Sequence, residues 1–180
     1  MSCCAASVTE DLPLPPSAYC VPTTTLRAEV RFADGSCQRG LLYLPPAAAR
    51  HAGPMRPEER LNDSDDFLPF LPEGCTEPVM LNKHQVMVLS LDAAEDEKLR
   101  EPWEAVGGVT PLPAAPEQRV VLECTGLRLE GVLVMDVPQH QQRLLDLLNR
   151  QERFVRLRSD GKLHLVSRER IVRASDVSER

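Results

Sequence analysis

The sequence predicts a mainly β protein with short helices (α+β), built as two tandem small β-modules related by internal duplication. The first observation is a pair of glycines five residues apart, Gly35 and Gly40, which recurs as Gly126 and Gly131. The second is that apolar and charged residues alternate around both pairs, as expected for half-buried strands. The third is composition, because 16 prolines and 4% aromatics in 180 residues favour turns and extended segments, with Leu and Val as the main core residues.

The repeat divides the chain into four regions. Residues 1–25 carry small residues, prolines and threonines without periodicity, so we expect a flexible or extended leader. The first β-module spans 26–91 and the second spans 117–177. Between them, 92–116 is acidic and then rich in Gly and Pro, which is typical of a solvated linker.

Each module opens with a predicted hairpin. In the first, Asp34-Gly35 precedes a returning strand from Cys37 to Leu44, because both turn residues tolerate a positive φ. In the second, Thr125-Gly126 takes the same place. The second glycine of each pair should lie where the strand bends or another backbone comes close.

A similar middle segment follows each hairpin. Arg-Leu-x-Asp begins at Arg60 and again at Arg143, and each leads to a phenylalanine, a short apolar run and an acidic-Gly turn. Leucines between Gln139 and Arg153 fall on one broad helical face, which predicts a short amphipathic helix. The acidic run 63–66 of the first module indicates a helix N-terminus or a loop.

Each module is expected to end in a second hairpin, with a short polar turn between two apolar strands. The sequence 79–89 matches 164–174, which aligns Lys83-His84 with Arg168-Glu169.

The charge differs between the two halves. Residues 1–115 hold 9 basic and 17 acidic side chains, a net −8, and residues 116–180 hold 12 and 10, a net +2. The whole chain carries −6, and an acidic protein gains nothing from long-range attraction to nucleic acid. Only the second half could therefore face a polyanion.

The sequence predicts no enzyme, no cofactor and no metal site. It lacks a G-x-S-x-G elbow, a phosphate-binding glycine loop, an H-E-x-x-H motif and a dinucleotide fingerprint. Its histidines are scattered, and its six cysteines form no C-x-x-C pair, so we expect free thiols in a reducing cytosol. No apolar run has the length of a membrane span and the N-terminus lacks a signal-peptide pattern, which predicts a cytoplasmic protein without membrane insertion.

The succession of strand, glycine, strand ending in glycine and later hairpin resembles the Sm-like barrel of RNA-associated proteins. Leu127 to Gly131 resembles the Sm strand that closes on a glycine, and Lys83 to Val86 resembles the Lys-His-x-Ile element of the bacterial Sm-type RNA chaperone. The resemblance implies an Sm-like β-barrel in each module and RNA contacts by Lys83 and His84. Both modules also resemble an uncharacterised bacterial domain found in one or two copies per chain, which implies no activity.

Two classes of function follow. The first is a non-catalytic protein-protein interaction or assembly module, a scaffold or adaptor subunit of a bacterial complex, whose unpaired strand edges take up another protein or a second copy. The alternative is binding of RNA or single-stranded nucleic acid through the arginine-rich second module. Strand alternation over 154–158 would turn arginines outward whether or not anything binds there.

The single tryptophan, Trp103, lies in the linker, where it should tuck into a groove of an adjacent module or anchor a partner. The residues that we expect at an interaction surface are Lys83, His84, Trp103, Arg153, Arg156, Arg158, Arg168 and Arg170.

Overall fold

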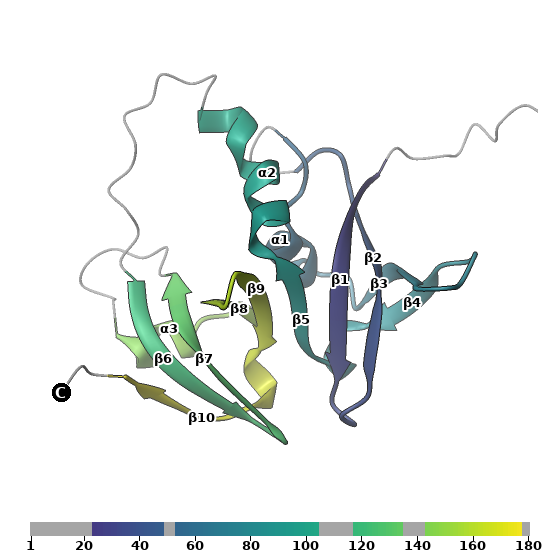
Figure 1. Cartoon of the computed structure of the whole chain (residues 1–180). Coiled ribbons are helices and arrows are strands. Elements are labelled where there is room, and N and C mark those ends of the chain that lie inside the picture. Colours follow the sequence, from purple (N-terminus) through teal and green to yellow (C-terminus); the bar gives the residue numbers. More distant parts are fainter. Residues whose placement is uncertain (1–22, 49–52, 105–116, 135–142, 178–180) are drawn as a thin grey trace, which may run out of the picture.

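Figure 1 shows the protein as a computed structural model, which describes residues 23–48, 53–104, 117–134 and 143–177. Within these ranges the chain forms ten strands and three α-helices. The strands are β1 (Thr24–Phe32), β2 (Cys37–Leu44), β3 (Phe67–Pro72), β4 (Val79–Asn82), β5 (Val86–Asp92), β6 (Glu117–Cys124), β7 (Leu127–Val134), β8 (Phe154–Ser159), β9 (Lys162–Ser167) and β10 (Ile171–Asp176). The helices are α1 (Pro57–Asn62), α2 (Ala93–Glu104) and α3 (Leu144–Leu148).

The ten strands of the described residues form one antiparallel sheet in the order β10-β6-β7-β8-β9-β5-β1-β2-β3-β4. The prediction of a mainly β protein with short helices is therefore confirmed. The sheet is continuous and, in the part of the chain described, it is not closed, so it differs from the two separate barrels that the sequence predicts. β4 and β10 lie at its two ends (Figure 1).

Both halves of the sheet have the same strand order, β5-β1-β2-β3-β4 in the first half and β10-β6-β7-β8-β9 in the second. The halves join where β5 pairs with β9. In each half, the last strand along the chain therefore lies beside the first, as β5 lies beside β1 and β10 beside β6. The junction consists of β5, the last strand of the first half, and β9, the fourth strand of the second half.

The glycine pattern is explained by turns and by close backbone contacts. Gly35 and Gly126 occupy the two hairpin turns with φ of +87° and +72°, which confirms the prediction for both. At Gly40 a Cβ atom would lie 2.1 Å from the Leu71 carbonyl oxygen. At Gly131 it would lie 2.4 Å from the carbonyl oxygen of Arg158 in the neighbouring strand, so both positions need the smallest residue.

The second predicted hairpin of each half does not form. β4 pairs with β3 and β5 pairs with β1, so the 3-10 turn Lys83–Gln85 carries the chain from one end of the half-sheet to the other. The 3-10 turn Arg168–Arg170 does the same between β9 and β10. β5 pairs with β1 inside the sheet because its residues Val86 to Leu89 are apolar on both faces. Both faces of such a strand need to be covered by other side chains.

The helices differ from their predictions in length and position. α3 is a single short turn that buries Leu147, not a helix from 139 to 153, and residues 135–142 lie outside the described residues. In the first half the helix precedes the acidic run, because Asp63 is the C-terminal cap of α1. Arg60 lies inside α1 whereas Arg143 caps the start of α3, so the Arg-Leu-x-Asp match pairs positions that are not structurally equivalent.

The linker begins with a helix rather than a solvated tether. The backbone N–H of Ala93, at the start of α2, donates to the Gly161 carbonyl oxygen at 3.0 Å, in the β8–β9 turn. Leu99 packs against the first core cluster, and Asp96 is buried. This cluster consists of the buried apolar side chains of β1 to β5 and α1, such as Val30 and Phe70, together with three side chains of β8 and β9. Residues 105–116 of the linker and residues 1–22 of the leader lie outside the described residues.

Candidate interaction site at the junction of the two halves

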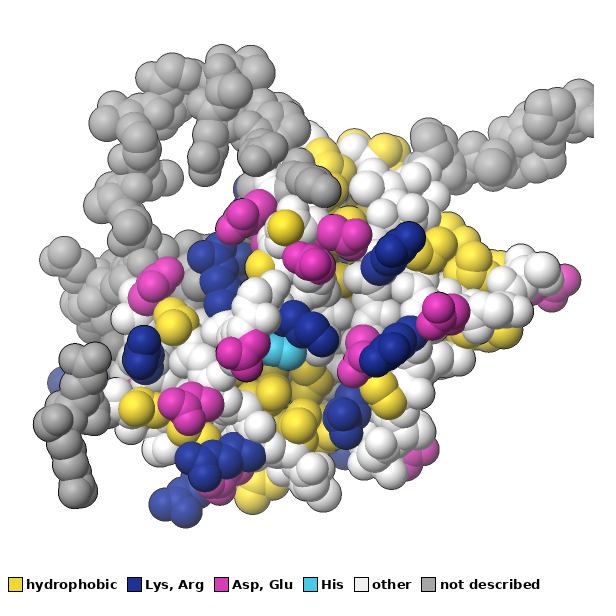
Figure 2. All heavy atoms as spheres, in the orientation of Figure 1, with side chains coloured by type: hydrophobic (Ala, Val, Ile, Leu, Met, Phe, Trp, Pro, Cys, Tyr) yellow, Lys and Arg dark blue, Asp and Glu magenta, His cyan; other side chains and the backbone are white. Residues whose placement is uncertain are grey.

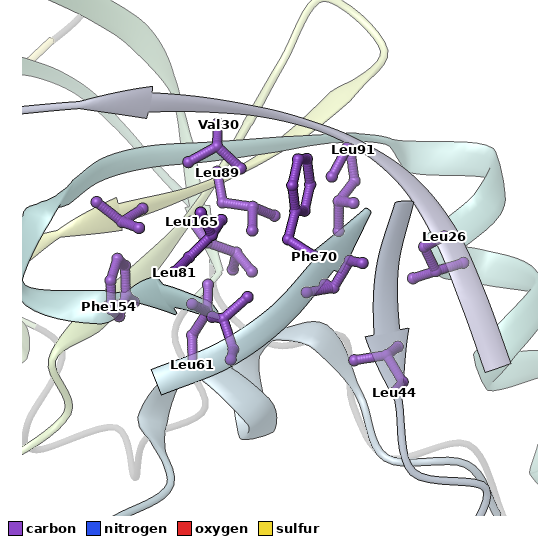
Figure 3. Close-up of a cluster of buried hydrophobic side chains, with 14 of the residues drawn as sticks. Leu26, Val30, Leu44, Leu61, Phe70, Leu81, Leu89, Leu91, Phe154 and Leu165 are labelled. Atoms are coloured by element: carbon purple, nitrogen blue, oxygen red, sulfur yellow. The ribbon is translucent and has the colours of Figure 1, made fainter. Parts of the chain in front are cut away.

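Strands β5 and β9 join the halves and give each half part of its core. Leu89 lies opposite Leu165 in this pairing. Leu163 and Leu165 of β9, with Phe154 of β8, are packed inside the first core cluster among residues such as Val30 (Figure 3). Each is at most 1% exposed, and burial of a side chain of this size contributes about 1.5–3 kcal/mol. The first core is therefore complete only when the second half is in place.

The first half also contributes side chains to the core of the second half. Met87 and Val88 of β5 belong to the second core cluster, where they join Leu122, Val155 and Leu157. β5 thus serves both cores, and separating the halves would expose apolar surface on each.

A histidine lies in the middle of the strand pair. His164 is opposite Ser90, and its Nδ1 lies 2.8 Å from the Ser90 Oγ in a hydrogen bond. Burial lowers the pKa of His164, and the positive charge of Lys162 lowers this pKa further. The imidazole is therefore held in its neutral form at the junction.

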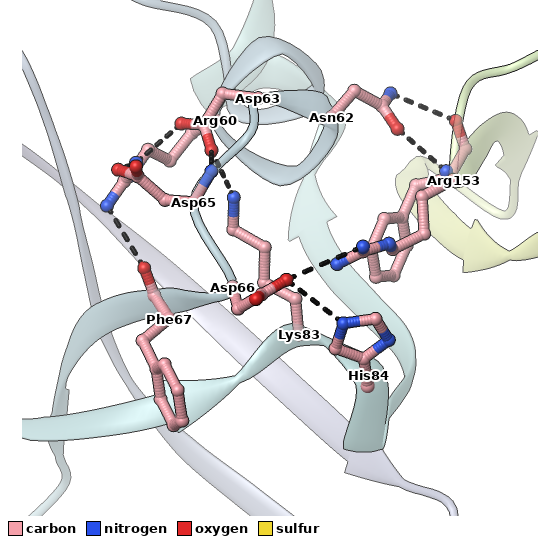
Figure 4. Close-up of polar contacts among 10 residues, drawn as sticks. Arg60, Asn62, Asp63, Asp65, Asp66, Phe67, Lys83, His84 and Arg153 are labelled. Atoms are coloured by element: carbon pink, nitrogen blue, oxygen red, sulfur yellow. Dashed lines mark hydrogen bonds and ion pairs between the residues drawn. The ribbon is translucent and has the colours of Figure 1, made fainter.

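Asn62, the last residue of α1, binds the start of β8. Its Nδ2 donates to the Phe154 carbonyl oxygen at 3.1 Å, and its Oδ1 accepts from the Phe154 backbone N–H at 2.8 Å (Figure 4). Both groups are partly buried. One side chain thus satisfies a donor and an acceptor of the other half at the residue whose ring enters the first core.

Lys83 is buried and forms an ion pair with Asp63 (Figure 4). Burial lowers the pKa of Lys83, and its hydrogen bond to Asp63 offsets only part of this effect. Burial alone would raise the pKa of Asp63, but hydrogen bonds from Lys83 and Arg60 outweigh it and hold this pKa below its usual value. Arg60 also binds Asp65 at 2.8 Å, so the cluster is a charge-balanced structural network rather than an open cation site.

Asp66 connects the two halves at the surface of the junction. Its Oδ1 lies 3.0 Å from His84 Nε2 and 3.6 Å from an Nη2 atom of Arg153, which comes from the second half (Figure 4). Arg170, also from the second half, donates to the His84 carbonyl oxygen at 2.7 Å. One arginine of the second half therefore binds the 3-10 turn of the first half directly, and another lies against Asp66, the partner of His84.

Arg156 makes a third link across the junction. Its guanidinium lies 3.5 Å from Glu58 of α1 and 3.6 Å from the buried Asp96 of α2. The acidic first half and the arginine-rich second half thus neutralise one another where they meet, which accounts for part of the charge difference in the sequence.

The structure separates the residues expected at an interaction surface into several groups. Arg153, Arg156 and Arg170 face the first half, and His84 lies between the halves. The buried position of Lys83 excludes it from a contact surface of this conformation. Residues that remain are Arg158 and Arg168, both partly buried, and Trp103, which belongs to α2 and whose side chain lies outside the described residues.

Within the described residues no group of three or more His, Cys, Asp or Glu side chains could hold a metal ion. The described thiols are free, with Cys37 and Cys75 exposed and Cys124 buried, and burial raises the pKa of Cys124. No described helix is both long and apolar enough to cross a membrane.

The two ends of the sheet expose apolar side chains. Among the described residues, the large apolar side chains that are exposed are Phe67, Val79, Met80, Leu145 and Val172. The first three lie on β3 and β4, and Val172 lies on β10. Figure 2 shows hydrophobic side chains at the margin where β4 lies in Figure 1, and charges of both signs mixed over the face in view.

Sequence reasoning missed Asn62, Asp66 and these exposed apolar residues. One signal was available, because a Leu-Asn pair places Asn62 five residues before Phe67 and Asn149 five residues before Phe154. The exposed positions on β4 and β10 had no such signal, since alternation alone does not tell which strands end a sheet.

Comparison with known proteins finds no matching family model, no matching curated protein and no matching solved structure.

Proposed function

We propose that the protein is a non-catalytic assembly module that takes up further polypeptide strands at the two ends of its sheet, β4 and β10. The observation that carries the proposal is the exposure of Phe67, Met80 and Val172 at these ends. An edge strand offers unpaired N–H and C=O groups, and proteins usually protect such edges with charge, proline or a covering element. Apolar side chains at both ends suit edges that are covered by another strand.

The junction between the halves supports the same function. β5 and β9 are themselves joined edge to edge, with apolar residues buried on both sides and polar links around them. The chain therefore already uses strand pairing to hold two β-units together. The polar groups at this junction bind one another, which favours a structural role over a catalytic one.

The proposal includes a common origin of the two halves. They share a strand order, and a hydrogen bond from the Lys83 N–H to the Asp66 carbonyl, at 2.9 Å, has an equivalent from Arg168 to Arg153 at 2.8 Å. This agreement supports internal duplication. The likeness of each half to the Sm-like barrel stays a prediction.

RNA binding by the second half draws less support. Arg153, Arg156 and Arg170 would have to leave partners in the first half before they could bind phosphates. Single-strand binders also stack bases on exposed aromatic side chains, and the described aromatic of the second half, Phe154, is buried.

Site-specific photo-crosslinking in the expressing cells tests the assembly function. A photoreactive amino acid would replace Met80 or Val172 in the full chain, with the exposed Thr25 on central strand β1 as the matched control. We expect adducts with a polypeptide from the two edge positions and none from position 25. Peptide mapping of each adduct identifies its source. Edge positions that give no adduct would overturn the proposal.

A further inference from the structure

We infer that each open end is covered by a second copy of this chain, so that β4 of one copy pairs with β10 of the next, head to tail. This inference rests on the proposed function and names its partner. It follows from the shared strand order: β4 is the counterpart of β9, and β10 is the counterpart of β5. The open ends are therefore the two strand types that already pair at the junction within the chain.

The bulges in the two halves fix which residues correspond. The pairing of β1 with β5 skips Met87, and the pairing of β6 with β10 skips Val172. Met87 and Val172 are thus counterparts. In the same way Phe67 pairs with Asn82 and Phe154 pairs with Ser167, which aligns β3–β4 with β8–β9.

The exposed residues of the β4 end correspond to buried residues of the junction. Phe67 is 53% exposed, whereas its counterpart Phe154 is 1% exposed because it lies in the core of the other half. Met80 is 61% exposed, whereas its counterpart Leu165 is fully buried there. Phe67 and Met80 are therefore apolar at the positions that insert into a neighbouring half, and among the described residues the first half has no such neighbour at β4.

The β10 end shows the complementary relationship. Val172 is 75% exposed, whereas its counterpart Met87 on β5 is 1% exposed, in the core that β5 completes. Asn149, an exposed asparagine that caps the C-terminal end of α3, is the counterpart of Asn62. Asn149 stands where it would bind the Phe67 backbone of the next copy, as Asn62 binds Phe154.

The charged contact of the junction has an apolar counterpart at the open ends. Within the chain, Arg156 faces Glu58 at 3.5 Å. The positions that correspond to them are Pro69 on β3 and Leu145 on α3, and Leu145 is exposed. If β9 paired with β10 of another copy instead of with β5, Arg156 would meet Leu145 in place of Glu58. The charge of Arg156 would then lose this partner, which favours the pairing of β9 with β5 and of β4 with β10.

The junction also gives the register of the intermolecular pair. Leu89 lies opposite Leu165 within the chain, and their counterparts are Ala174 and Met80. Met80 of one copy is therefore expected opposite Ala174 of the next. The contact joins different surfaces of the two copies, so repetition of the same contact builds a closed ring or a longer filament.

Light scattering coupled to size-exclusion chromatography tests the inference on the full chain. We expect the wild-type protein to have a mass that is a multiple of 20.0 kDa at high concentration and to dissociate on dilution. Met80→Arg and Val172→Arg should each give monomers. Thr25→Arg, which adds the same charge on an inner strand, should keep the wild-type mass. Equal urea midpoints of diluted monomers would show that the edge variants are folded.

Mixing the two edge variants tests the head-to-tail direction. The Met80→Arg chain keeps a native β10 and the Val172→Arg chain keeps a native β4, so the mixture should form a dimer of the two chains and nothing larger. Either variant dimerising by itself would overturn the inference, because it would show an edge paired with its own kind. A wild-type monomer at every concentration would overturn it too, while edge crosslinks to a different protein would leave the assembly function standing.

A second test uses the register. Cysteine would replace Met80 in one chain and Ala174 in the other, both in a background in which every native cysteine except the buried Cys124 is serine. Oxidation of the mixture should give a disulfide between unlike chains. Disulfides that join only like chains would contradict the pairing of β4 with β10.

Discussion

Asn62 binds both polar backbone atoms of Phe154, although 92 positions separate the two residues. The amide of Asn62 thereby replaces a strand as the partner of a backbone donor and acceptor at the start of β8. The ring of the same phenylalanine lies in the first core (Figure 3). A polar contact and an apolar contact thus fix one residue of the second half in the first.

Substitution of Asn62 by alanine should destabilise the protein. The change leaves the partly buried N–H and C=O of Phe154 without their partner, at a cost of about 2 kcal/mol. Urea unfolding followed by circular dichroism would measure the loss. Gln85→Ala, which removes an exposed amide, should change the free energy of unfolding little, and equal effects of the two substitutions would contradict the assigned role.

The two partners of the buried ion pair should respond unequally to substitution. Asp63→Asn leaves the buried Lys83 ammonium without a charged partner, and such a change costs about 3 kcal/mol or more. Lys83→Met should cost less, because Asp63 keeps its ion pair with Arg60. In a chain that already carries Lys83→Met, Asp63→Asn should lower the free energy of unfolding by less than it does in the wild-type chain. If the losses of the two single variants simply add in the double variant, the two residues are not coupled.

Stability should fall as the pH decreases through about 6.5, the usual pKa of histidine. The pKa of His164 is lower in the folded protein than in the unfolded chain, so unfolding takes up a proton below this pH and is favoured by acid. Thermal unfolding between neutral and mildly acidic pH should show this loss, and His164→Gln should reduce it. His84→Gln should retain the loss, because it leaves His164 in place.

The glycines at the strand contacts should not tolerate a methyl group. A Cβ at Gly40 or Gly131 would meet a neighbouring carbonyl oxygen at 2.1 or 2.4 Å, so the strands would have to separate. We expect Gly40→Ala and Gly131→Ala each to cost about 1–3 kcal/mol, as overpacking of a core does. Chemical denaturation would measure it, with the exposed Cys37→Ala on the same strand β2 as the control. Wild-type stability of both glycine variants would argue against the close contacts.

The parts of the fold that the sequence predicts well are those set by neighbouring residues. Asp34-Gly35 and Thr125-Gly126 determine their turns locally, and the strands beside them follow from alternation. The sequence predicts a hairpin at the end of each module, because 79–89 and 164–174 look like two strands with a turn. Their actual partners lie far away in the sequence, at β1 and β6, and no local pattern specifies them.

The candidate site was harder to predict for the same reason. Arg153 and Arg156 look like a solvent-facing basic stripe in the sequence, but their partners are Asp66 and Glu58 of the other half and Asp96 of the linker helix α2. Strand alternation indicates which side chains leave the core. It does not tell whether they then meet water, a ligand or another part of the same chain.

The supply of β9 side chains to the first core has a consequence for biosynthesis. Leu163 and Leu165 leave the ribosome long after β1 to β5 have been made, and they belong to the core that those strands surround. Until then the nascent first half presents an uncovered β5 edge and an incomplete interior. The first core can therefore be completed only after the second half has been made, and a chain with an incomplete core and an open strand edge is prone to pair with the wrong strand.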